Sequence, residues 1–221
     1  MWKTVSISAA MLLSASSSFA QIAHADRGYF DLGGGVAISP DATSSDLVGE
    51  VGVKVAKNLF VFGDLGQFHN LQPSLVQPAV DATDAALLNN GVTVNGIARV
   101  PAWYSVGGVR FMMPTASGIS PYVLGGAGFA RLSPAAKFTY ASGALAGATP
   151  AVGDDVTPDL VTLSDFTQPP ATNAFMFTAG AGVQVPVAPH VSVDVGYRLS
   201  RVNGDTPINA QSIVAGIGYR F

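Results

Sequence analysis

The chain has 221 residues, no cysteine and a formal net charge of −3. Charged side chains make up 11 % of the sequence, under half of the roughly 25 % usual for a soluble domain, whereas hydrophobic side chains make up 48 %. These values exclude a disulfide framework and a cysteine nucleophile, and they argue against nucleic acid as a partner because no basic block is present.

The N-terminal segment has the organisation of a secretory signal peptide. A lysine is followed by a mostly apolar stretch over residues 5–15, and small residues precede a cleavage point after Ala20. A second candidate cleavage point follows Ala25. The apolar stretch is shorter than the roughly 20 residues that a membrane-spanning helix needs. We therefore expect residues 1–20 to be a signal peptide and residues 21–221 to form one exported domain.

Eight later segments alternate between apolar and polar side chains. The last is the clearest, with Ile213 and Ile217 on one parity and Arg220 on the other. Alternation of this length predicts a β-strand whose two faces meet different surroundings. The predicted strands cover residues 28–38, 46–56, 59–68, 100–113, 121–132, 173–185, 191–200 and 212–221.

The connections between these segments alternate in length. Residues 57–58, 114–120 and 186–190 are short, whereas residues 69–99 and 133–172 are too long for ordinary hairpins. Short turns at one end and long loops at the other are typical of an up-and-down barrel in an outer membrane. An even number of strands then places both termini at the periplasmic end.

The long loops are where we expect any extracellular partner to bind, because binding sites gather on loops held by a rigid scaffold. Within the first loop, residues 71–90 form an amphipathic stretch that predicts a short helix. Its apolar side would contain Val80, Leu87 and Leu88, and Gly91 would follow its C-terminal cap.

Nine charged residues lie on the polar parity of the predicted strands: Asp31, Glu50, Lys54, Asp64, Arg110, Arg131, Asp194, Arg198 and Arg220. In a soluble barrel these charges would face water and the apolar parity would fill the core. In a membrane barrel the apolar parity faces lipid and the charges lie inside. Burial without pairing costs several kcal/mol per ion, and the near balance of acids and bases allows pairing.

Two features favour the membrane arrangement. Aromatic side chains near strand ends on the apolar parity resemble the girdles of membrane interfaces: Phe30, Trp103, Tyr122, Phe175, Phe177, Tyr219 and Phe221. Glycine is frequent in the strands, which suits tight curvature or large interior side chains that need room. Because side chains nearly fill an eight-stranded barrel, we expect a salt-bridged interior rather than an ion path.

Three segments carry a resemblance to a known family. Residues 121–128 (PYVLGGAG), 193–198 (VDVGYR) and 217–221 (IGYRF) resemble the small eight-stranded outer-membrane barrels of bacteria, which include OmpA/OmpX-like and opacity-type proteins. The resemblance implies an integral outer-membrane barrel. It also implies that Ile217, Tyr219 and Phe221 form the C-terminal signal read by the outer-membrane assembly machinery. The family includes adhesins, structural barrels and small channels, so the resemblance implies no single role.

No constellation of residues predicts catalysis. The three histidines, His24, His69 and His190, show no metal-ligand spacing, so we expect no metal and no cofactor. Residues 197–201 resemble a lipid-deacylase motif weakly, but Arg201 stands where that motif needs histidine.

The sequence therefore predicts one eight-stranded antiparallel up-and-down transmembrane β-barrel with short periplasmic turns and long extracellular loops. We expect a monomer in the outer membrane of a bacterium, with a structural or surface-interaction role and without catalysis. One alternative is a small passive channel. A second alternative is a soluble exported barrel that binds a small apolar ligand.

Overall fold

The computed structural model describes residues 27–113, 115, 118–145, 149–163 and 166–221. The predicted signal peptide and both candidate cleavage points lie outside the described residues.

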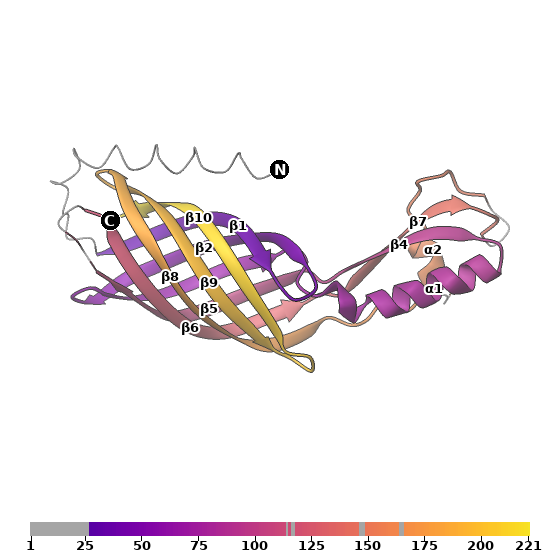
Figure 1. The fold of residues 1–221 in the computed structure, drawn as a ribbon, viewed down its shortest axis with the longest axis horizontal. Helices are drawn as coiled ribbons and strands as arrows, with labels where there is room; N and C mark the ends of the chain where they lie inside the picture. Colours follow the sequence, from indigo (N-terminus) through magenta and orange to yellow (C-terminus); the bar gives the residue numbers. More distant parts are fainter. Residues whose placement is uncertain (1–26, 114, 116–117, 146–148, 164–165) are drawn as a thin grey trace, which may run out of the picture.

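Eight antiparallel strands close into a barrel in the order β1–β10–β9–β8–β6–β5–β3–β2, which confirms the predicted fold class (Figure 1). The strands are β1 (Gly28–Ile38), β2 (Thr43–Ala56), β3 (Leu59–Phe68), β5 (Ala102–Met112), β6 (Ser120–Leu132), β8 (Thr172–Ala188), β9 (Val191–Asn203) and β10 (Ile208–Arg220). Every predicted strand overlaps one of these, with boundaries that differ by a few residues.

The first and last strands meet where the barrel closes. β1 pairs with β10, with Phe30 opposite Tyr219, and the amide of Gly28 donates to the carbonyl oxygen of Phe221 over 3.0 Å. The connections β2–β3, β5–β6 and β8–β9 are short and lie at this same end (Figure 1). In the two-residue turn between β2 and β3, Asn58 has a φ of 67°, a left-handed conformation that asparagine tolerates better than most residues. This end is the periplasmic one.

The two long connections contain more regular structure than the one short helix that the sequence predicted in the first of them. The first holds η1 (Pro73–Leu75), α1 (Gln77–Asn89) and β4 (Thr93–Arg99), and the second holds β7 (Ala135–Ser142) and α2 (Thr157–Thr162). β4 pairs with β7 in a separate two-stranded sheet. These five elements form a projection from the extracellular end of the barrel, which we call the arm (Figure 1).

The arm continues the β5–β6 hairpin beyond the barrel. Ala102 pairs with Leu132 in the barrel, and Arg99 pairs with Ala135 at the base of the arm. Between these pairs the amide of Ser133 donates to the carbonyl oxygen of Pro101 over 2.9 Å, so backbone hydrogen bonding continues from the barrel into the arm. The arm is therefore connected to the barrel through two adjacent strands.

The arm has its own hydrophobic core. The predicted helix is present, and it packs Val80 and Leu87 against β4. Gly91 follows it with a φ of 78°, and the amide of Val92 donates to the carbonyl oxygen of Leu87 over 2.9 Å, which confirms the predicted C-terminal cap. The placement of Leu88 on the apolar side was wrong, because this side chain is 61 % exposed.

A second cluster closes the other side of the arm. Phe138 on β7 and Phe166 stack edge to face with centroids 5.0 Å apart, next to the buried Leu160 of α2. Ahead of α2, the amide of Thr157 donates to Oδ1 of Asp155 over 3.1 Å, and the side chain of Thr157 helps to lower the pKa of this exposed carboxyl. The buried core of these elements indicates an ordered unit.

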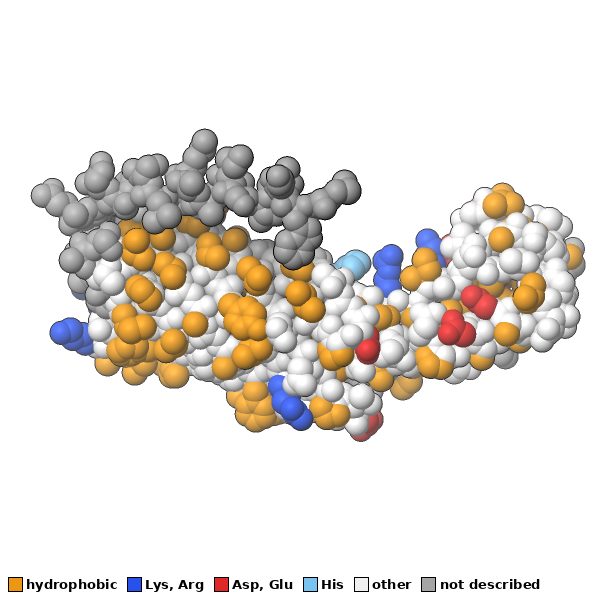
Figure 2. All heavy atoms as spheres, in the orientation of Figure 1, with side chains coloured by type: hydrophobic (Ala, Val, Ile, Leu, Met, Phe, Trp, Pro, Cys, Tyr) orange, Lys and Arg blue, Asp and Glu red, His pale blue; other side chains and the backbone are white. Residues whose placement is uncertain are grey.

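The barrel is apolar outside and holds its buried charges inside, together with apolar side chains such as Phe60 and Phe62. Val195 is 50 % and Ile217 is 65 % exposed on the outer face, whereas Asp194 and Arg198 on the opposite face are buried. Apolar side chains spread over the outer wall (Figure 2). This arrangement is the inverse of a soluble ligand-binding barrel, in which apolar side chains fill the interior. No helix in the described part of the chain has the length and apolarity needed to cross a membrane.

On strand β6 the inward and outward faces are the opposite of those predicted. On β6 the sequence assigned Tyr122 to the lipid side and Arg131 to the interior, but Arg131 is exposed and Tyr122 is buried, as are Leu124 and Leu132 on the same face. The register explains the error. Leu124 pairs with Arg110 of β5, and paired residues face the same side of a sheet, so the inward Arg110 requires an inward Leu124.

Candidate functional site

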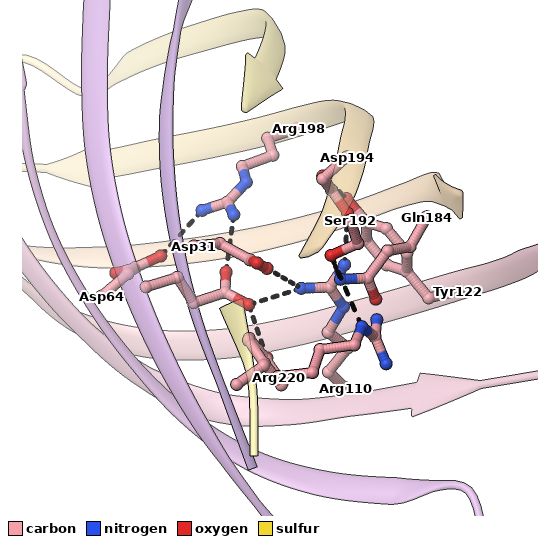
Figure 3. A network of polar contacts seen from close by, with 11 residues as sticks. Asp31, Asp64, Arg110, Tyr122, Gln184, Ser192, Asp194, Arg198 and Arg220 are labelled. Carbon is pink, nitrogen blue, oxygen red and sulfur yellow. Dashed lines mark hydrogen bonds and ion pairs between the residues drawn. The ribbon is translucent and has the colours of Figure 1, made fainter. Parts of the chain in front are cut away.

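A network of ion pairs crosses the barrel interior, with Arg110 at its centre (Figure 3). The Arg110 side chain is 1 % exposed, and its guanidinium contacts three carboxylates. Nη1 lies 2.8 Å from Oε1 of Glu50 and 3.1 Å from Oδ2 of Asp31, and Nη2 lies 2.5 Å from Oδ2 of Asp194. Charge-assisted hydrogen bonds of this kind are short and strong.

A second arginine extends the network. Arg198 Nη2 lies 2.6 Å from Oε2 of Glu50, and its Nη1 lies 2.8 Å from Oδ2 of Asp64. Glu50 thus binds one arginine with each carboxylate oxygen. The six charged members come from β1, β2, β3, β5 and β9, so the network ties opposite walls of the barrel together.

Tyrosines bind two of the four carboxylates as well. Tyr29 donates to Oε1 of Glu50 over 2.6 Å, and Tyr122 donates to Oδ1 of Asp194 over 2.7 Å. The Tyr122 ring also lies under the Arg110 guanidinium, with Cζ 3.6 Å from the ring centroid, which is a close cation–π contact.

Glycines on neighbouring strands make room for these large rings. A Cβ at Gly52 would clash with the Tyr29 ring, and a Cβ at Gly182 or Gly196 would clash with the Tyr122 hydroxyl. The glycine enrichment of the strands therefore has a local cause here. It leaves space for interior tyrosines that reach across the lumen.

The nine charged residues predicted for the interior do not all lie there. Six are buried in the network: Asp31, Glu50, Asp64, Arg110, Asp194 and Arg198. Arg220 is half-buried near the periplasmic end, where its Nε lies 3.4 Å from Oγ of Ser192. Lys54 and Arg131 were placed wrongly, because both are exposed.

These two errors have different causes. Lys54 shares the inward parity, but it lies at the periplasmic mouth, where β2 continues past the filled part of the lumen. Arg131 is on the outward parity of β6, as its strand register requires. The network therefore joins four carboxylates to two guanidinium groups, instead of the near balance predicted. Two arginines can contact all four carboxylates because each guanidinium group has several hydrogen-bond donors.

Sequence reasoning missed two polar residues inside the barrel, Tyr29 and Asp46. Asp46 is buried, and its Oδ1 accepts a hydrogen bond from Tyr104 over 3.1 Å. Tyr29 shares the parity of Asp31 on its own strand, and that parity was the available signal. Gln184 shares the polar parity of β8, and it donates to Oγ of Ser192 over 2.8 Å.

The residues considered for other chemistry do not come together. Ser200 is buried in the barrel with its hydroxyl 3.3 Å from Oγ1 of Thr178, whereas His69 is exposed at the extracellular rim. Within the residues that the structure describes, no group of three or more His, Asp or Glu side chains is placed to hold a metal ion.

The three residues of the predicted C-terminal signal face outward. Ile217, Tyr219 and Phe221 are all more than half exposed on the outer wall next to β1. His190 stacks near Tyr219, with ring centroids 5.7 Å apart. The apolar surface of this strand is thus continuous down to the periplasmic edge.

Comparison with known proteins gives one family match. The model of the family described as "outer membrane protein beta-barrel domain" matches residues 7–221. No curated protein sequence matches the chain.

Several solved outer-membrane barrels are similar in fold. Neisserial surface protein A (NspA) is 15 % identical with a TM-score of 0.55, over 88 % of this chain and 97 % of that one. Ail, the attachment invasion locus protein of Yersinia pestis, is 15 % identical with a TM-score of 0.48, over 89 % and 99 %. The N-terminal barrel domain of Pseudomonas aeruginosa OprF is 12 % identical with a TM-score of 0.48, over 89 % and 98 %.

The family model covers almost the whole chain, including all eight barrel strands. The apolar outer wall of this barrel faces the lipid of a bacterial outer membrane, and the chain belongs to the outer membrane protein beta-barrel domain family.

Proposed function

We propose that this protein is a closed, non-conducting barrel that holds the arm at the cell surface, where the arm contacts a partner outside the cell. The observation that carries the proposal is the arm itself. Its β4–β7 sheet and its helices share a buried core, so it is a shaped surface rather than a set of loose loops.

The filled lumen supports a structural role for the barrel over a channel. The ion-pair network joins five of the eight strands, and Phe60, Phe62 and Tyr104 are also buried inside. Side chains nearly fill an eight-stranded barrel, and paired charges stay in place more readily than solvated ones. The network thus stabilises the barrel and closes it to ions.

Exposed apolar side chains support a contact role for the arm. Val152 is 79 % exposed, and Leu88, Ile97, Val161 and Leu163 are also exposed. These exposed apolar groups of the arm are available for contact with another molecule.

A barrel without the arm provides the direct test of the contact role. Phe68 pairs with Ala102 and Leu132 pairs with Thr172, so short glycine-rich turns in place of residues 70–100 and 134–170 can rejoin the strands. The intact and shortened proteins, each in lipid nanodiscs, are screened against arrays of surface glycans and extracellular matrix proteins. We expect binding that the shortened barrel loses. Equal binding by both proteins would contradict the proposal.

The closed lumen is tested by conductance in planar bilayers at neutral pH. We expect no current steps from the intact protein. Regular steps that persist in highly purified protein would overturn the closed barrel and favour a small passive channel.

The proposal extends to biogenesis. Residues 1–20 direct export, and the outward strand that carries Ile217, Tyr219 and Phe221 contacts the assembly machinery before the monomer closes. The lipid-side exposure of these three side chains supports this assignment. We expect a Phe221→Ser variant to accumulate unassembled in the periplasm. Normal assembly of this variant in cell fractionation would contradict that role.

A further inference from the structure

The outward side chains of the barrel change from apolar to polar near its extracellular end. On β9 the apolar Leu199 is followed two positions later by Arg201, and on β6 Phe129 is followed by Arg131. The corresponding outward positions on four other strands are also polar: Ser45, Gln67, Asn173 and Gln211. The two arginines therefore face outward where hydrocarbon gives way to lipid headgroups.

Neither arginine is paired with an acid in the part of the chain that the structure describes. Arg131 lies between Trp103 and Asn173 in the strand register and has no hydrogen-bond partner there. Arg201 Nε donates to Oδ1 of Asn203 over 3.0 Å, and the side chain remains exposed. Both guanidinium groups thus keep donors for a ligand, whereas Arg110 and Arg198 in the interior bind carboxylates through both of their Nη atoms.

An aromatic patch separates the two arginines on the outer wall. Phe175 stacks edge to face on Phe129 with centroids 5.5 Å apart, and on Phe177 with centroids 4.7 Å apart. In the register Arg131 is opposite Asn173, and Arg201 is opposite Phe177 on the same strand, β8. The arginines thus flank a surface that suits acyl chains.

We propose that Arg131 and Arg201 bind the phosphate groups of outer-leaflet lipids, while the acyl chains of those lipids pack on Phe129, Phe175 and Phe177. An arginine on the lipid face is costly at the bilayer midplane but nearly neutral at the interface, where it reaches the headgroups. Guanidinium also matches phosphate geometry with two parallel hydrogen bonds. Near this end Asp46 is buried inside the barrel and the other acids lie in the connections and the arm, so phosphate is the complementary group available to these outward arginines.

Trp103 offers a direct reporter, because it is exposed on the outer wall opposite Arg131. The full chain carries Trp2→Phe, so that Trp103 is its one tryptophan. It is refolded into vesicles of equal parts phosphatidylcholine and phosphatidylglycerol, with brominated acyl chains on one lipid or on the other. The ratio of quenching by the two lipids measures the enrichment of phosphatidylglycerol next to Trp103.

We expect phosphatidylglycerol to be enriched roughly five-fold, the effect of one basic residue near an anionic surface, and we expect Arg131→Gln to remove most of that enrichment. Lys57→Gln removes the same charge at the periplasmic turn and should leave the ratio unchanged. A second reporter is placed next to Arg201 by Phe177→Trp in the chain that also carries Trp2→Phe and Trp103→Phe. We expect Arg201→Gln to remove most of the phosphatidylglycerol enrichment measured there. Heat-modifiable migration checks that every variant is folded.

Three outcomes would overturn the proposal. They are equal quenching by the two lipids in the parent protein, an enrichment that survives Arg131→Gln, and an enrichment that inorganic phosphate abolishes while chloride at the same ionic strength does not. The last outcome would assign the arginines to free phosphate instead of lipid.

Discussion

Arg110 is the side chain on which the interior network depends most. It is almost completely buried and contacts carboxylates from β1, β2 and β9. Arg110→Met would leave these carboxylates without their shared partner, which typically costs about 3–5 kcal/mol. We expect that loss in the free energy of unfolding, measured by urea titration of the protein in phospholipid vesicles. Lys57→Met, at an exposed turn, is the matched control, and equal stability of the two variants would show that the network contributes little.

The space left by glycine is a second feature at the residue scale. Gly52→Ala places a methyl group against the Tyr29 ring, which donates to Glu50. Gly63→Ala meets no neighbouring atom within 4 Å. We expect the first variant to lose about 1–3 kcal/mol of stability through overpacking and the second to stay close to the parent. Equal effects of the two variants in the same urea titration would argue against a spacing role.

Residue parity was enough to find most of the interior charges but not all of the interior. Asp194 and Arg198 lie on a strand whose other face is apolar from Val191 to Leu199, so their direction could be predicted. On β6 both faces carry apolar residues and glycine, and the direction of Arg131 depends on its pairing with β5. Ion-pair partners could not be predicted either. Parity indicates the face of the sheet on which a residue lies, but it does not give the position of the residue along the barrel axis.

Among the elements, the docking of α1 on β4 holds the arm together. Val80 of α1 lies over Gly96 of β4, where a side chain would clash with it. Gly96→Val should release the helix and expose the arm to proteinase K, while the barrel fragment stays resistant. Asn95→Val, one position away and exposed, should leave the digestion pattern unchanged. Rapid cleavage within the barrel strands of Gly96→Val, or no change at all, would contradict this view of the arm.

The barrel strands could be predicted element by element, whereas β4 and β7 could not. Each barrel strand is long and has an apolar face towards lipid. β4 has seven residues, and its partner β7 lies beyond two barrel strands in the sequence, so no hairpin turn links the pair. The buried face of β4 meets a helix inside the arm, and an isolated sequence does not reveal that partner. The helix α1 itself was predictable, because its cap is local.

At the scale of the whole molecule, the outer wall of the barrel and its interior have different roles. The outer wall is apolar from the periplasmic edge to the level of Arg131 and Arg201, and the interior is tied together by charge. The arm extends past the membrane from the end of the barrel opposite the C-terminus (Figure 1). The account depends on this division, because a barrel with the opposite orientation of faces would be a soluble protein.

Site-directed spin labelling tests that division most directly, since the chain has no cysteine of its own. Single cysteines at the outward Val195 and Ile213 and at the inward Ser200 and Ser212 are labelled with nitroxide in refolded vesicles. Our account predicts that the outward labels collide freely with dissolved oxygen, which concentrates in hydrocarbon, and that the inward labels are immobile and protected. Oxygen collisions at Ser200 and Ser212, with Val195 and Ile213 protected, would contradict it.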